Sequence, residues 1–245
     1  MENNNLTKKE RKELKRQEKM EKTLDIRKNK KVKAVALWSA VFAVLIIGIG
    51  GIVYLAAKGA GGGDEGQTAS LILAEDDWIK GQTEAKAVLV EYSDFQCPAC
   101  AYFMPVLEKL SRDFPNDLKI IYRHFPLPQH KNAKLAAYAA EAAGQQRKFF
   151  EMADMIFEKQ TVWSNFSNSK AKELFIDFAK NLELNPEQFE NDIENDDIKK
   201  SVEDDYKSGV GLNINATPTF FLNGKKLQNP KSYDDFKKII EEEIK

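Results

Sequence analysis

The residues best suited to chemistry are Cys97 and Cys100, the only two cysteines in a chain of 245 residues. Two residues separate them, so in a helix their sulfurs lie about one turn apart and can form a disulfide or resolve a mixed one. A disulfide across so short a loop restricts the unfolded chain little, which makes a purely structural bond the weaker interpretation. The spacing therefore predicts a redox-active dithiol.

The elements around the dithiol place Cys97 at a strand-to-helix junction. An apolar run leads into it and predicts a buried strand over 87–92. Apolar residues then recur at helical spacing and predict a helix from Pro98 to about Asp113. Pro98 suits the first turn of that helix, where its missing N–H has no partner to lose.

This junction favours a negative charge on Cys97. The first N–H groups of a helix are unpaired, and its dipole is positive at that end. A thiolate held there has a pKa below the free value of about 8.5, which makes it both a nucleophile and a good leaving group. Cys100, one turn on, is then the resolving cysteine.

The segment carrying these residues resembles the thioredoxin superfamily, and its DsbA-like branch in particular. Pro105 follows Cys100 by five residues, as in the first helix of thioredoxin-like proteins. Glu91 precedes Cys97 by six residues, where DsbA-like proteins carry a buried acid beside the dithiol. The approach over 94–98, Asp-Phe-Gln-Cys-Pro, is similar to theirs as well.

The residues between the cysteines are Pro98 and Ala99, and the resemblance implies that they face the substrate. Ala99 departs from the family's best-known strong oxidants, which have His at this position. A high redox potential is therefore not carried over, and we expect a milder one.

Pro218 is a second element of chemical interest. Pro218 lies in the segment Ala-Thr-Pro-Thr-Phe-Phe-Leu over 216–222, which matches the cis-proline loop of thioredoxin-like folds. The resemblance implies a cis Thr217–Pro218 bond beside the dithiol. It also implies that the Thr217 backbone pairs with an extended substrate, in the manner of an added strand.

Glu91 is predicted to relay a proton, through water, to the buried Cys100. An acid in an apolar strand is buried only where it is paired or functional. The alternative is a strand position that faces solvent. Asp94 is interpreted as a turn residue rather than as a relay.

The charge distribution points to a membrane. Residues 1–33 contain 13 Lys/Arg and 6 Asp/Glu, a balance of +7. Residues 34–57 carry no formal charge, and about 24 residues suffice to span a bilayer. The positive-inside rule then places 1–33 in the cytoplasm and the rest outside. A cleavable signal peptide is the competing interpretation, although its apolar core is usually shorter.

The remaining organisation follows from turn and helix signals. A Gly-rich linker over 58–70 precedes a folded domain over 71–245. A second strand over 118–125 completes a parallel βαβ unit. Asn223-Gly224 predicts a hairpin, and Ser232 starts a C-terminal helix. Helices are expected over 132–143 and 196–208, ending at Gly144 and Gly209, and also over 147–160, over 169–182 and from Asn185.

The predicted fold is therefore α/β and thioredoxin-like, with a helical domain inserted at about 130–208 and one transmembrane helix before it. A plain thioredoxin fold lacks so many helices at this point, whereas DsbA-like proteins have them.

The expected activity is thiol–disulfide oxidoreduction outside the cytoplasm, which introduces or exchanges disulfides in exported proteins. Its substrates would be reduced or misoxidised exported polypeptides. The resemblance implies reoxidation by a quinone-linked membrane partner of the DsbB or VKOR kind. Membrane lipid is contacted through the single helix, and no cofactor or metal is expected.

Several alternatives remain open. The same fold supports a reductase or an isomerase, and an anchored domain could hold peptides without turnover. A zinc site would use Cys97, Cys100, His124 and His130, but the gap of 23 residues before His124 exceeds the usual spacing of about 12–15. The near balance of 37 basic and 38 acidic residues argues against a nucleic-acid partner.

Overall fold

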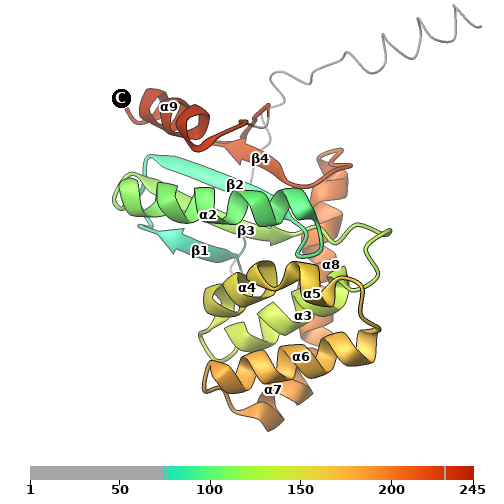
Figure 1. The fold of residues 1–245 in the computed structure, drawn as a ribbon. Helices are drawn as coiled ribbons and strands as arrows, with labels where there is room; N and C mark the ends of the chain where they lie inside the picture. Colours follow the sequence, from blue (N-terminus) through green and yellow to red (C-terminus); the bar gives the residue numbers. More distant parts are fainter. Residues whose placement is uncertain (1–73, 75–76, 229) are drawn as a thin grey trace, which may run out of the picture. The chain divides into compact units, whose positions relative to one another are not determined.

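A computed structural model describes residue 74 and residues 77–228 and 230–245 (Figure 1). The predicted tail, membrane span and linker, 1–33, 34–57 and 58–70, lie outside these residues. No helix within the described part of the chain is both long enough and apolar enough to cross a membrane.

Five strands in the described residues form one mixed sheet in the order β1-β3-β2-β4-β5. Strands β2 and β3 are parallel, as the predicted βαβ unit requires, and the other neighbouring pairs are antiparallel. Glu91 lies in the central strand, opposite Tyr122 on β3 and Phe220 on β4. The strands are β1 (Trp78–Gly81), β2 (Ala87–Ser93), β3 (Leu118–His124), β4 (Thr219–Leu222) and β5 (Lys225–Lys226).

Helices cover both faces of the sheet because successive strand residues point to opposite sides. Leu89 and Phe220 pack against α2 (Pro98–Asp113) and α9 (Tyr233–Glu243) on one face. Val90 and Phe221 pack on the other face, beside α8 (Asp196–Gly211) (Figure 1). Helix α2 carries Pro105 within it, as predicted.

The helices between β3 and β4 form a core of their own beside the sheet (Figure 1). Besides α8, they are α3 (Ala133–Gly144), α4 (Phe149–Glu158), α5 (Gln160–Trp163), α6 (Asn168–Asn181) and α7 (Pro186–Ile193). The predicted helix over 147–160 is thus two helices with a break at Lys159. Cys97 and Cys100 belong to the same apolar cluster as this helical core. The dithiol therefore lies where the sheet and the helical insertion meet.

Two glycines were expected to end helices. Gly144 is the last residue of α3, with Gln145 as the C-cap, whereas Gly209 lies inside α8. A Cβ at Gly144 would lie 2.3 Å from the Trp78 ring, and one at Gly209 would lie 2.6 Å from Phe125. Both glycines thus allow an aromatic ring to approach the helix backbone.

The residues with left-handed backbone that follow these two helices are not glycines. Arg147 and Asn213 adopt left-handed φ values of 64° and 56°. After each, the next N–H bonds back to the carbonyl five residues earlier, Lys148 to Ala143 and Ile214 to Gly209. This is the Schellman arrangement, with a non-glycine residue at the position that usually favours glycine.

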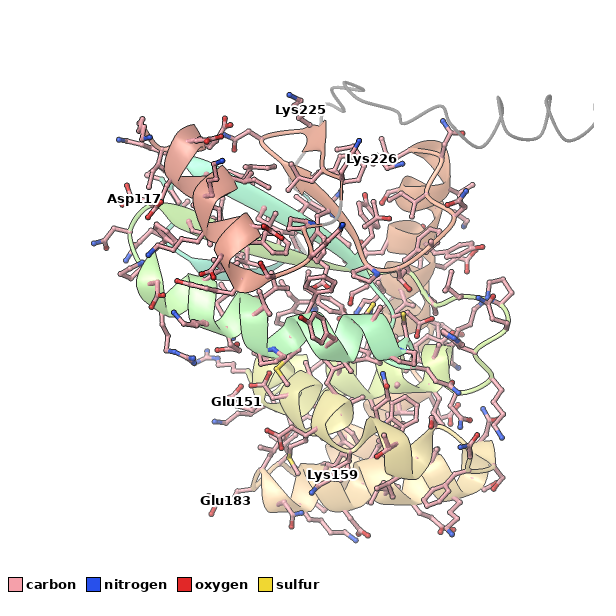
Figure 2. All side chains as sticks on the ribbon, turned by 45° about the horizontal axis from the view of Figure 1, so that its top comes forward. Asp117, Glu151, Lys159, Glu183, Lys225 and Lys226 are labelled. Atoms are coloured by element: carbon pink, nitrogen blue, oxygen red, sulfur yellow. The ribbon has the colours of Figure 1, made fainter. Side chains whose placement is uncertain are left out.

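The hairpin and the capping residues follow the prediction. Asn223 and Gly224 have φ values of 47° and 80°, as a two-residue turn of this kind requires. The β5 strand after the turn is shorter than predicted and carries Lys225 and Lys226 (Figure 2). Asn185 and Ser232 accept N–H groups at the starts of α7 and α9.

Replacing Gly209 by alanine tests the close approach of α8 to the sheet. The added methyl group meets the buried rings of Phe125 and Tyr92, so we expect a loss of about 1–3 kcal/mol in the free energy of unfolding. Gly211 is a matched control, because its Cβ would meet nothing within 4 Å and alanine is the better helix former by up to about 1 kcal/mol. Urea unfolding of both variants measures the difference, and equal midpoints would contradict it.

Candidate active site

Cys97 is the N-cap residue of α2, and Cys100 lies in the first turn. Cys97 has an extended backbone, and the helix begins at Pro98 as predicted. Both cysteines are free thiols. Cys97 is 7% exposed and Cys100 is 1% exposed, so one sulfur borders the surface and the other is sealed beneath it.

The surroundings of Cys97 favour its thiolate and lower its pKa to about 5. The main cause is a hydrogen bond from the Cys100 thiol; burial opposes it, and the Thr217 side chain and the backbone N–H groups of Cys100 and Ala99 contribute further. The backbone contribution is the helix N-terminus effect that the sequence predicts. Cys97 is therefore largely a thiolate at neutral pH.

Cys100 and Glu91 show the opposite behaviour. Burial raises the pKa of Cys100 well above its usual value, and the nearby Glu91 and Cys97 charges add to this. Burial likewise raises the pKa of Glu91 to about 7. Ser93 Oγ donates to Glu91 Oε1 at 2.8 Å, which partly offsets that burial. Glu91 is 4% exposed, so the alternative of a solvent-facing strand position is wrong.

The proline loop lies directly against the reactive sulfur. The Thr217–Pro218 bond is cis, in agreement with the expectation from the resemblance. Cys97 Sγ lies 3.3 Å from the Thr217 carbonyl oxygen. The buried Thr217 hydroxyl has no hydrogen-bond partner within the described part of the chain, so it is available to a thiolate. The structure thus brings together two segments 120 residues apart.

The remaining predicted residues lie around this pair. Pro98 and Ala99 are exposed beside Cys97. Asp94 accepts the Gln96 N–H as the predicted turn residue does, and it also bonds His130 Nδ1 at 2.7 Å. The Asp94 N–H points at Cys100 Sγ, 3.5 Å away. His130 is therefore linked to the dithiol through Asp94.

The histidines do not gather with the cysteines as a zinc ligand set. His124 Nε2 bonds Glu141 at 2.8 Å, and His130 bonds Asp94. Among the residues that the structure describes, no three or more His, Cys, Asp or Glu side chains are grouped to hold a metal ion.

Three amide side chains that the sequence analysis missed tie the active-site loop to the helical insertion. Gln160 on α5 donates to the carbonyls of Phe95 and Cys97, at 2.8 and 2.9 Å. Gln96 donates to the Ser164 carbonyl and accepts the Asn132 N–H, both at 2.8 Å. Asn132 then donates to the Phe166 carbonyl. We call these three residues the amide network.

The amide network has a weak signal in the sequence. Gln160 is 6% exposed, and a buried amide must find partners to offset its desolvation. Its partners lie more than 60 residues away, however, and no local spacing reveals such a contact. Of the three residues, only Gln96 lies within the sequence motif around Cys97.

The family described as Thioredoxin matches residues 74–242, which is more than half of the chain. The chain belongs to this family. The match covers the sheet, the helical insertion and both segments of the site.

Solved structures with the same fold include DsbA-type proteins. BdbD from Bacillus subtilis is 29% identical, with a TM-score of 0.60 over 68% of this chain and 91% of that one. Alpha-DsbA1 from Wolbachia pipientis is 23% identical, with a TM-score of 0.63 over 70% and 92%. Alpha-DsbA2 from the same organism, described as a thiol-disulfide exchange protein, is 19% identical with a TM-score of 0.58 over 67% and 85%. The family is thus thioredoxin-like with DsbA-type structural neighbours.

The curated relatives are larger proteins. A Na(+)/H(+) antiporter NhaA 1 from Mycobacterium sp. (strain KMS) is 35% identical over 161 residues, 64% of this chain and 25% of that protein. The antiporter NhaA from Herminiimonas arsenicoxydans is 36% identical over 154 residues, 63% and 23%. The chain thus spans about a quarter of the length of the curated relatives that it matches.

Glu91 should make stability depend on pH. Its pKa rises from 4.5 to about 7 on folding, so its contribution to stability is complete below pH 4.5 and is lost as pH rises through 7. The loss amounts to roughly 3 kcal/mol, at 1.36 kcal/mol per pKa unit. As the pH rises from 4.5 to 8, the free energy of unfolding of Glu91→Gln should therefore increase by about that much relative to the parent. Urea unfolding at several pH values measures the difference. Parallel pH curves for the two proteins would refute the assignment.

Gln160→Ala should raise the pKa of Cys97, because the amide that fixes the Cys97 carbonyl at the helix start is removed. Thiolate absorbance at varied pH measures the shift, and the disulfide-exchange rate should fall at acidic pH where the thiolate is depleted. Thr161→Ala is the control, since Thr161 is the exposed neighbour on α5. An unchanged thiolate titration would show that Gln160 only supports the fold.

Proposed function

We propose that this chain catalyses thiol–disulfide exchange with other polypeptides through Cys97 and Cys100. The observation that carries the proposal is the asymmetry of the two sulfurs. Cys97 borders the surface with a pKa of about 5, whereas Cys100 is buried with a pKa well above its usual value. Cys97 is thus suited to attack and to leave as a thiolate, and Cys100 is suited to be released and protonated when the disulfide breaks.

In the oxidising direction, a substrate thiolate attacks Cys97 of the Cys97–Cys100 disulfide. The sulfur–sulfur bond breaks, and its electron pair goes to Cys100, which takes up a proton. A second substrate thiolate then attacks the substrate sulfur of the mixed disulfide. Cys97 leaves as a thiolate, the substrate gains a disulfide, and the enzyme departs with a reduced dithiol.

Glu91 is proposed to supply the proton that Cys100 requires. With a pKa of about 7, it carries a proton in about half of the molecules at neutral pH and returns to that state readily. Its electrostatic influence on Cys100 places the carboxyl near the leaving sulfur. Both directions of exchange therefore have a proton donor or acceptor inside the protein.

Substrate binding is proposed at the surface around Cys97. Pro98 and Ala99 are exposed, and the Thr217 backbone lies beside the sulfur that a substrate must reach. An extended peptide that pairs with the Thr217 backbone would bring its own cysteine against Cys97. This recognition uses main-chain groups, so it suits many polypeptide sequences.

An oxidase outside the cytoplasm is the direction and location that we propose. The uncharged segment 34–57 and the basic tail before it support a single-pass anchor with the catalytic domain outside. Reduced or misoxidised exported polypeptides would be the substrates, and a quinone-linked membrane partner of the DsbB or VKOR kind would restore the disulfide. The proposed oxidase activity rests on the dithiol and its surroundings, and the transport activity named for the antiporter relatives is not used to support it.

Serine variants of the two cysteines test the chemistry. Cys97→Ser should abolish disulfide exchange with a reduced test protein, because the disulfide that the substrate thiolate attacks can no longer form. Cys100→Ser should accumulate a mixed disulfide with an oxidised test protein, because the Cys97 thiolate attacks the disulfide of that protein and no Cys100 is present to release it. The product is visible as a mass increase that a reductant reverses. Full activity of Cys97→Ser would overturn the proposal.

The redox potential decides the direction. Equilibration of the domain with glutathione buffers should give a potential well above the roughly −270 mV of thioredoxin, since thiolate stabilisation favours the reduced form. A value near that of thioredoxin would instead assign the chain as a reductase. Ala99→His should raise the redox potential further, because the lack of His at this position is the reason to expect a milder oxidant.

A further inference from the structure

A small cavity is lined by the buried Glu91 and by the partly exposed side chains of Lys80, Glu108 and Asp154. Its volume is about 50 Å³, and about 10–15 Å³ is enough for one water molecule. Apolar side chains from α2, β3 and α4 form most of its wall. A narrow, mostly apolar passage of this kind holds few water molecules, and its polar groups determine where they bind.

The inner end of the cavity contains two polar groups, of which one lacks a protein partner. Glu91 and Tyr122 line it, opposite each other on β2 and β3. The Tyr122 hydroxyl is buried and has no hydrogen-bond partner among the described residues. A buried hydroxyl without a protein partner is satisfied by water in most proteins. The orphaned hydroxyl is thus available to bind a water molecule in the cavity that Glu91 also lines.

The outer end of the cavity carries three charged side chains, Lys80, Glu108 and Asp154. Lys80 and Glu108 form an ion pair, and each side chain is 26% exposed. Asp154 has no hydrogen bond or ion pair with any residue that the structure describes, and it is only partly buried. Its carboxyl is therefore the group at the mouth that is free to exchange protons with solvent.

We propose that Asp154 and the water in this cavity form the route by which Glu91 exchanges its proton with solvent. The proposal rests on the function proposed above and adds to it a role in proton transfer for Asp154, a residue of the helical insertion. Asp154 would act as a proton shuttle at the mouth, the cavity water would carry the proton, and Glu91 would receive it.

The proton balance of one half-cycle requires such a route. A substrate thiolate attacks Cys97, the disulfide breaks, and Cys100 takes the proton of the Glu91 carboxyl. Glu91 is left as a buried carboxylate, which its surroundings disfavour. One proton must then enter from solvent, and it passes from Asp154 through the cavity water to Glu91. The reverse path removes the proton when the dithiol is oxidised again.

The charges around both ends suit this role. Ser93, Tyr122, Cys97 and Cys100 are the groups facing Glu91. Lys80 on β1, Glu108 on α2 and the α4 neighbours Glu151 and Glu158 act on Asp154. Burial, with those acidic neighbours, raises the pKa of Asp154 to about 6, close to that of Glu91. Proton transfer between groups of similar pKa is nearly balanced in either direction.

The test compares Asp154→Asn with the control variant Glu173→Gln. Both remove one carboxylate from the helical insertion, but Glu173 lies on α6, is exposed and does not line the cavity. The rate at which a cysteine-containing peptide reduces the oxidised full chain is measured at neutral pH and low buffer concentration. We expect Asp154→Asn to lower this rate about tenfold, less than the loss of a directly acting general acid. Glu173→Gln should retain the parental rate.

Rescue by a small acid separates proton transfer from a structural effect. Added formate or imidazole should restore the rate of Asp154→Asn in proportion to its concentration and leave Glu173→Gln unchanged. The solvent deuterium isotope effect should be larger in Asp154→Asn than in the parent. Equal rates for Asp154→Asn and the parent, or a slow rate without rescue, would overturn the route. An inactive parent would overturn the proposed function itself, which keeps the two failures distinct.

Filling the cavity is an independent test. Ala153 lines it and is 5% exposed, so Ala153→Leu places new methyl groups in the space that water would occupy. We expect slower exchange that formate and imidazole do not restore, because the passage itself is blocked. Ala153→Leu with the parental rate and a folded far-ultraviolet spectrum would contradict a water route.

Discussion

The whole site depends on two sulfurs that lie one helical turn apart and differ in their access to solvent. Cys97 receives the hydrogen bond from Cys100 and the N–H groups of the first turn, so its negative charge is stabilised. Cys100 lies beneath it with Glu91, where a charge on either is disfavoured. The sheet, the first helix and the proline loop each contribute one part of this difference.

The helical insertion contributes to the chemistry as well as to the fold. Its apolar core continues into the cluster that contains both cysteines. Gln160, Gln96 and Asn132 bind the loop before Cys97 to α5 and to the turn after it. The start of α2 is therefore fixed from two sides, by β2 through the chain and by the insertion through these amides. A loop held in this way keeps the Cys97 thiolate and its hydrogen-bond donors at constant distances.

The sequence predicts the local features of the site better than the long-range ones. The dithiol spacing, Pro98 and the apolar periodicity correctly place Cys97 at the start of a helix. The resemblance correctly predicts the cis bond before Pro218, which spacing alone does not reveal. Gly144 does end α3, but Gly209 lies inside α8, because a glycine that admits the Phe125 ring looks the same in the sequence as one that ends a helix. Gln160 was missed because its partners are distant in the chain.

The two edge strands of the sheet have a consequence for aggregation. One edge is β5, which is two residues long and carries two lysines, and the other is the four-residue β1. Short and charged edges resist the addition of foreign strands, which is the first step of many aggregates. Under the proposed function, an incompletely folded substrate, rich in unpaired backbone, would thereby be kept from docking along β1 or β5 and co-precipitating with this protein.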